Sequence, residues 1–164
     1  MLAVFVAGEL ESPRWGEELH ARGDLGPRQL LEETRAYERR EGLFFGFPHD
    51  VDWFRTVSPL DEVLDILYID WDWWLRISGG TRNARDAARR VRAREFDAVT
   101  VEEHEPIARS RAPLIAVTDP ARTRVVLVEG HARLTAYALF PELAPAEVEL
   151  ILGVSPGIAG WCQF

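Results

Sequence analysis

The chain has 164 residues, 47% of them hydrophobic, and a formal net charge of −8, which fits one globular domain or a domain with an extension. All 19 basic residues are arginine, and the lack of lysine excludes a lysine-containing phosphate loop, a Schiff-base lysine and a pyridoxal anchor. No apolar run approaches the ~18 residues of a membrane span, so we expect no membrane partner. The single cysteine, Cys162, excludes an internal disulfide and fits a reducing, cytoplasmic setting.

Charge is divided unevenly along the chain. Residues 1–75 carry 16 acidic residues and 7 arginines, whereas residues 76–164 carry 11 acidic residues and 12 arginines, giving −9 and +1. We therefore predict an acidic, aromatic-rich extension over residues 1–75 and a domain over residues 76–164. The overall excess of acid does not favour DNA as a partner, although a local basic face leaves DNA possible.

The first half of the chain predicts short elements separated by turns. Residues 1–8 form an apolar run typical of a strand, and residues 28–40 have the one-sided pattern of a charged helix. Residues 43–48 are aromatic and predict a loop or short strand. Ser58, followed by a proline and an acid, is a helix start signal, and the apolar spacing over residues 60–68 predicts that the helix continues there.

A tryptophan-rich segment and an arginine-rich helix come next. Residues 71–74 either pack in the core or form a stacking wall for a base or sugar. Gly80, Thr81 and Arg82 make a turn before a predicted helix over residues 83–94. Six arginines and one acid lie between Arg82 and the end of that helix, which indicates either a solvated face or a surface that docks phosphates.

The second half predicts a small mixed sheet with packed helices, of the α/β or α+β class. Residues 99–101 are a possible strand, while residues 113–118 and 123–128 flank a turn and should form a hairpin. Residues 146–152 alternate and predict the final strand. A helix over residues 131–140 should pack on the sheet through three side chains on one face: Leu134, Tyr137 and Ala138. The acidic run around His104 is typical of a solvated loop, and we predict no metal site there.

The junction between the last two predicted elements is the strongest functional signal. An apolar strand ends at Glu129 and Gly130, and a helix begins at His131, with Arg133 in its first turn. Free backbone amides and the positive end of the helix dipole make such a junction an anion site. Glu129 is either a salt-bridge partner of an arginine or a general base or metal ligand. His131 is either a hydrogen-bonding residue at the helix end or a phosphate-binding or acid–base group.

The order strand, turn, strand, acid, glycine, two variable positions, arginine and helix resembles the ParB/sulfiredoxin-like superfamily over about residues 78–152. The cysteine of sulfiredoxins would fall at His131, which excludes that activity. ParB proteins carry Gly-Glu-Arg-Arg where this chain has Gly130, His131, Ala132 and Arg133. The chain is more similar to free serine kinases of this fold, in which the acid activates a substrate hydroxyl and the glycine–arginine turn holds nucleotide phosphates.

This resemblance implies a nucleotide-binding protein that is a phosphotransferase or nucleotide hydrolase acting on a small hydroxyl substrate, with ATP, ADP or CTP and Mg²⁺ as cofactors. The catalytic residues would be Glu129 and His131, and the nucleotide would be bound by Gly130, Arg133, Gly80, Thr81 and Arg82. One alternative is a non-catalytic nucleotide- or DNA-responsive module. Another is a protein-interaction or immunity factor that keeps the fold without its chemistry.

Overall fold

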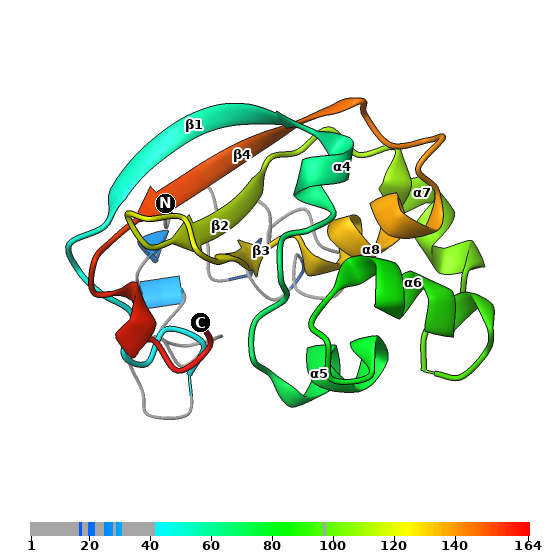
Figure 1. Ribbon diagram of the computed structural model, residues 1–164, viewed down its shortest axis with the longest axis horizontal. Coiled ribbons are helices and arrows are strands. Elements are labelled where there is room, and N and C mark those ends of the chain that lie inside the picture. The colour runs from blue at the N-terminus through cyan, green and yellow to red at the C-terminus, as the bar shows by residue number, and fades with distance from the viewer. Residues whose placement is uncertain (1–16, 18–19, 22–24, 28, 31–41, 97) are drawn as a thin grey trace.

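The computed structural model describes residues 17, 20–21, 25–27, 29–30, 42–96 and 98–164. The predicted strand over residues 1–8 lies outside them, as does the predicted helix over residues 28–40 except for residues 29–30. The chain has an α+β fold: helices gather beside one four-stranded mixed sheet (Figure 1). The strand order across the sheet is β1-β4-β2-β3. The strands are β1 (Asp52–Pro59), β2 (Leu114–Thr118), β3 (Val125–Glu129) and β4 (Glu147–Val154).

The predicted hairpin and final strand are confirmed. β2 and β3 pair antiparallel, and β4 runs parallel to β2, with Leu114 opposite Leu150. Within the turn between β2 and β3, the Asp119 carboxylate accepts the Thr123 amide at 3.1 Å. An aspartate that binds a later amide fixes a tight connection of this kind.

β1 was not predicted, and it corrects the expected helix start at Ser58. It pairs antiparallel with β4 along its whole length, so Ser58 belongs to a strand and caps no helix. The helix that follows, α4, covers only Leu60–Val63. The chain then becomes extended, and Leu67 hydrogen-bonds with the β3 backbone, its amide donating to the Val125 carbonyl at 3.0 Å. The predicted helix therefore ends at Val63, and Leu67 instead pairs with the edge strand β3. Because β1 belongs to the same sheet as β2, β3 and β4, the sheet contains residues from both sides of the predicted boundary after residue 75.

The helices that come after α4 are α5 (Asp72–Ser78), α6 (Ala84–Arg92), η1 (Glu102–His104), α7 (Glu105–Ala108), α8 (His131–Leu139) and η2 (Ile158–Gly160). Two of them, α6 and α8, were predicted from the sequence, and the others were not. Asn83 caps α6 by accepting the Arg85 amide at 2.8 Å, which confirms the predicted helix start. Residues 99–101 are not a strand, because the chain bends there and enters η1.

Two hydrophobic clusters cover the two faces of the sheet. The first places Leu134 and Tyr137 of α8 against the sheet, as predicted, with Ala138 partly buried beside them. The second packs the opposite face against Phe44, Ile158 and Trp161. β2 is buried along its whole length because both clusters cover it. Among the described residues, no helix is long and apolar enough to cross a membrane.

Candidate functional site

The strand-to-helix turn at Gly130 has the geometry that the sequence predicts. Glu129 ends β3, and Gly130 is the N-cap of α8 with a φ of +102°, a conformation that favours glycine. A Cβ on Gly130 would lie 2.3 Å from the Leu114 Cδ2 atom and 3.2 Å from the Arg133 Nη2 atom. The turn therefore needs glycine both for its backbone angle and for the close approach of these two side chains.

An ion pair closes the turn. The Arg133 guanidinium donates from Nη2 to the Glu129 carboxylate at 2.9 Å, and the two side chains are 13% and 22% exposed. The Arg133 Nε atom is buried and has no hydrogen-bond partner among the described residues. A cation in the first turn of a helix is unfavourable beside the positive end of the helix dipole. Glu129 offsets this cost, and an anion at the turn would do so as well.

His131 lies beneath the turn, in an aromatic setting. It is 7% exposed, and its ring stacks on Trp74 with 4.7 Å between centroids and 20° between planes. The Tyr68 ring lies 5.9 Å away on a tilt. Burial lowers the pKa of His131 to about 3, so the imidazole is neutral at pH 7. The buried Nε2 atom has no hydrogen-bond partner among the described residues.

A buried hydroxyl pair fixes the start of α8 behind His131. The Thr135 hydroxyl donates to the His131 carbonyl at 2.8 Å and lies 2.6 Å from the Tyr68 hydroxyl. Thr135 has one hydroxyl proton, so the Tyr68 hydroxyl is the donor between the two oxygens. Burial raises the pKa of Tyr68 well above its usual range, which keeps that donor protonated.

Sequence reasoning missed Tyr68 and Trp74 as neighbours of His131. They lie far from it in sequence, and Tyr68 was assigned to a packing helix. The signal that could have found Trp74 was the stacking interpretation of residues 71–74. For Trp74 the structure favours the alternative of core packing, because its ring packs against both hydrophobic clusters and stacks on the protein's own imidazole.

The connection between α5 and α6 contains the three predicted nucleotide-binding residues Gly80, Thr81 and Arg82, and their hydrogen bonds stabilise it. The Gly80 amide donates to the Leu75 carbonyl at 2.7 Å, and the Thr81 hydroxyl donates to the Ser78 carbonyl at 3.0 Å. The Arg82 guanidinium donates to three backbone carbonyls, of Tyr68 at 2.7 Å, Gln163 at 2.8 Å and Phe164 at 2.9 Å. These hydrogen bonds reach the site only through the backbone of Tyr68 and do not touch the turn at Gly130.

The substitution Arg82→Ala should lower the free energy of unfolding by about 2–4 kcal/mol, because three carbonyls lose a charged donor. This is less than three times the roughly 1.5–3 kcal/mol of one charged hydrogen bond, since Arg82 is half-buried and water can replace part of its contacts. Arg94→Ala is the matched control. Both arginines have a left-handed backbone, with φ of 61° and 55°, and the Arg94 side chain has no hydrogen bond within the described part of the chain. Urea denaturation of both variants measures the difference. Equal losses would show that the three hydrogen bonds do not stabilise the fold.

The arginines of α6 are used within the molecule. The Arg85 guanidinium donates to the Asp61 carbonyl at 2.8 Å, and Arg90 donates to the Arg76 carbonyl at 2.8 Å. Arg89 pairs with Asp86, and Arg92 donates to the Leu139 carbonyl. These guanidinium groups already have partners within the molecule, which disfavours the alternative of a surface that docks phosphates.

The buried imidazole makes stability depend on pH in a defined window. The folded-state pKa of His131 is lowered to about 3, below the ~6.5 of an unfolded histidine. Stability is therefore intact above about pH 6.5 and falls as the pH drops toward 3, by roughly 1.4 kcal/mol per pH unit. At pH 5 the loss should be about 2 kcal/mol. His131→Phe keeps a ring against Trp74 but has no titratable nitrogen. Urea denaturation at pH 5 and pH 7.5 should therefore show a smaller difference in stability between the two pH values for this variant than for the unchanged protein. An unchanged difference would contradict the assignment.

The site offers few metal ligands of its own. Across residues 42–96 and 98–164, no three His, Cys, Asp or Glu side chains group as a metal site. The buried Nδ1 atom of His104 instead lies 2.9 Å from the Thr100 carbonyl. Mg²⁺ usually binds through one or two carboxylates together with substrate phosphates, and Glu129 is the carboxylate that the turn provides.

No family model matches this chain, and no curated protein and no solved structure is significantly similar to it. The resemblance to the ParB/sulfiredoxin-like superfamily therefore stays a prediction that depends on the motif alone.

Proposed function

We propose that this protein binds the phosphate groups of a nucleotide at the Gly130 turn and transfers a phosphoryl group to a small hydroxyl substrate or to water. The observation that carries the proposal is a pair of buried nitrogens without partners, His131 Nε2 and Arg133 Nε, at the N-terminus of α8. Buried polar atoms normally have partners. The first amides of a helix also lack acceptors within it, so several polar groups without partners belong to the first turn of α8.

The arrangement suits phosphate better than a neutral ligand. Arg133 is fixed by Glu129 through Nη2, so Nε remains to donate. Phosphoryl transfer depends mostly on positioning and charge neutralisation, which arginine, helix amides and Mg²⁺ supply without lysine. In the proposed step the hydroxyl oxygen bonds to the γ-phosphorus of a nucleoside triphosphate while the bond from that phosphorus to the bridging oxygen breaks. The nucleoside diphosphate leaves with the electron pair of that bond, and Glu129 takes the hydroxyl proton. A reducing compartment such as the cytoplasm fits both the nucleotide and the single Cys162.

A thermal-shift screen with ATP, ADP, CTP and GTP, each with and without Mg²⁺, tests the proposal. A nucleotide that binds only the folded state must raise the melting temperature. With the best nucleotide, Arg133→Ala should weaken binding by about 1.5–3 kcal/mol in calorimetry, the scale of a charged hydrogen bond.

The control is Arg85→Ala, which removes an exposed arginine whose contacts run to α4 and Asp65. It should leave nucleotide affinity unchanged. Equal weakening by both substitutions would point to general charge attraction. Unchanged affinity in Arg133→Ala would place the nucleotide elsewhere.

A second candidate function is a binding module without catalysis. It is favoured by the ion pair that commits the Glu129 carboxylate to Arg133, together with the neutral, buried state of His131. The two functions differ in phosphate release from a bound nucleotide under single-turnover conditions. Binding without any release supports the module.

A further inference from the structure

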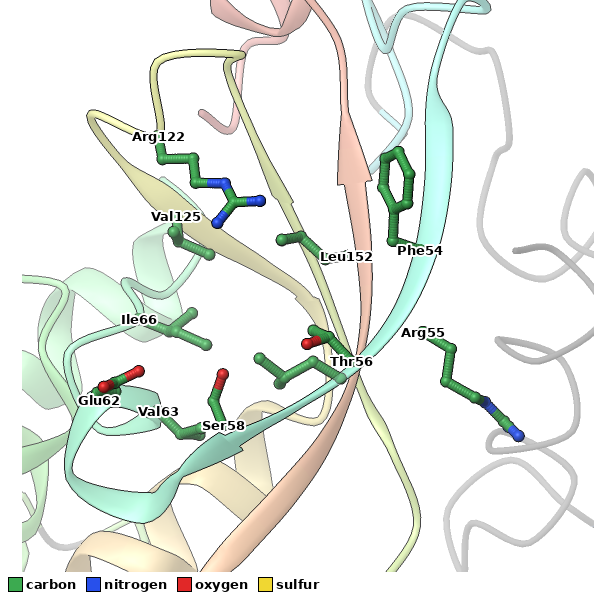
Figure 2. Close-up of a pocket in the computed structure, with 11 residues that line it drawn as sticks. Phe54, Arg55, Thr56, Ser58, Glu62, Val63, Ile66, Arg122, Val125 and Leu152 are labelled. Carbon is green, nitrogen blue, oxygen red and sulfur yellow. The ribbon is translucent and has the colours of Figure 1, made fainter.

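A hollow lies away from the Gly130 turn, on the face of the sheet that α8 covers. It has a volume of about 530 Å³, and its floor is formed by side chains of β1, β3, β4 and the region of α4 (Figure 2). The apolar members of that lining are Phe54, Val63, Ile66, Val125, Leu150 and Leu152. Phe54 is 54% exposed, so its ring is open to a ligand in the hollow. Ligand pockets of small molecules have volumes in this range and mostly apolar walls.

An exposed cation, Arg122, lies at the edge of this apolar floor. Figure 2 shows the Arg122 guanidinium directed over the hollow, with the hydroxyls of Ser58 and Thr56 on the other side. The Arg122 side chain has no hydrogen bond or ion pair within the described part of the chain. Its backbone has a φ of 54° in the turn that Asp119 closes, and the Arg122 amide donates to the Asp119 carbonyl at 3.0 Å. Strained residues of this kind gather at ligand sites.

The other arginines at the hollow have partners, whereas the Arg122 side chain has none within the described part of the chain. Arg55 contributes to the wall, but its guanidinium points away and pairs with Glu149 at 2.6 Å (Figure 2). Arg124 borders an adjoining hollow and donates to the Phe164 carbonyl at 3.0 Å. Glu62 is the carboxylate on the rim, and it would repel an anion placed near it. A ligand that fits must therefore carry its charge at the Arg122 end.

We propose that this hollow binds a small organic anion with an apolar body, of the class of a medium-chain aliphatic carboxylate. The carboxylate would pair with Arg122, and the chain would cover Phe54, Val125 and Leu152. The site is separate from the Gly130 turn, because Val125 and Glu129 are the two ends of β3, about 13 Å apart at strand spacing. The inference therefore does not depend on the proposed nucleotide site.

Fluorescence titration with 8-anilinonaphthalene-1-sulfonate, followed by competition with octanoate below its micelle concentration, tests this site in the full chain. We expect octanoate to displace the probe at least tenfold more effectively than octylammonium, which has the same apolar body and the opposite charge. Arg122→Gln should weaken octanoate by roughly 10–100-fold, as expected for a lost charged hydrogen bond. Phe54→Thr should weaken both anions several-fold, because it removes exposed floor without removing a buried side chain.

The matched control is Arg55→Gln, which removes a guanidinium of the same wall that faces away from the hollow and should change affinity less than twofold. Melting temperatures show whether each variant folds. If Arg122→Gln melts early, Arg122→Gly removes the same cation in a residue that accepts a φ of 54°. Unchanged octanoate affinity in a folded Arg122 variant would overturn the proposal. Equal or better displacement by octylammonium would also overturn it, since Glu62 would then govern binding.

Discussion

The substitution Gly130→Ala is expected to lower the free energy of unfolding by about 3–5 kcal/mol. Part of this loss, roughly 1–3 kcal/mol, comes from holding an alanine at a φ of +102°. The rest comes from the new Cβ, which would lie 2.3 Å from the Leu114 Cδ2 atom. Leu114 is fully buried at the start of β2, so it cannot move away without disturbing the core, and overpacking of this kind costs about 1–3 kcal/mol.

Gly80→Ala separates the two causes. Gly80 also has a positive φ, of 88°, but a Cβ there meets no atom within 4 Å. This control should therefore lose only the backbone part, about 1–2 kcal/mol. Urea denaturation measures the free energy of unfolding of both variants, provided that the slope of this free energy against urea concentration is the same in each. If the two glycines lost equal stability, the close packing of Leu114 against the turn would not matter, and the turn would be less tightly fixed than its geometry indicates.

The parts of the fold that could be predicted are those in which local chemistry and tertiary packing agree. The β2–β3 hairpin was predictable because two apolar runs flank a turn with Asp119, and β4 because its residues alternate. β1 was missed because Ser58 and Pro59 carry a helix signal, although in the structure the pairing with β4 extends to Pro59. The apolar spacing of residues 60–68 has two origins, a short helix and then an extended segment against β3, and no local pattern separates them.

The candidate site could also be predicted only in part. The backbone of the turn could be predicted, because the glycine, the strand before it and the helix after it are adjacent in sequence. The surroundings of His131 could not, since Trp74 and Tyr68 reach it only through packing of distant segments. This matters for chemistry: in the sequence, His131 was a candidate acid–base group, whereas burial among aromatic rings lowers its pKa to about 3 and leaves it neutral. Arg82, a candidate phosphate ligand, instead holds three backbone carbonyls.

If Glu129 is the general base of the proposed phosphoryl transfer, Glu129→Gln should reduce turnover by a factor of roughly 10²–10⁴, the usual contribution of a general base. The amide keeps the shape of the side chain and can still accept from Arg133, but it cannot take the hydroxyl proton. Nucleotide affinity should be unchanged or higher, because the substitution removes a negative charge 2.9 Å from the guanidinium that would hold phosphate. A selective loss of turnover with binding retained is thus the expected result, measured as phosphate release under single-turnover conditions and as affinity in calorimetry.

Glu149→Gln is the matched control for this last prediction. Glu149 also pairs with an arginine, Arg55 at 2.6 Å, and it lies on the same sheet in β4, away from the Gly130 turn. Because both substitutions remove the negative charge of a Glu–Arg pair, a loss of stability common to both variants reports the lost charge and not the chemistry. Only Glu129→Gln should reduce turnover per folded molecule. If it melts early and its folded fraction releases phosphate at the normal rate, Glu129 is a structural partner of Arg133, and the base must be sought elsewhere.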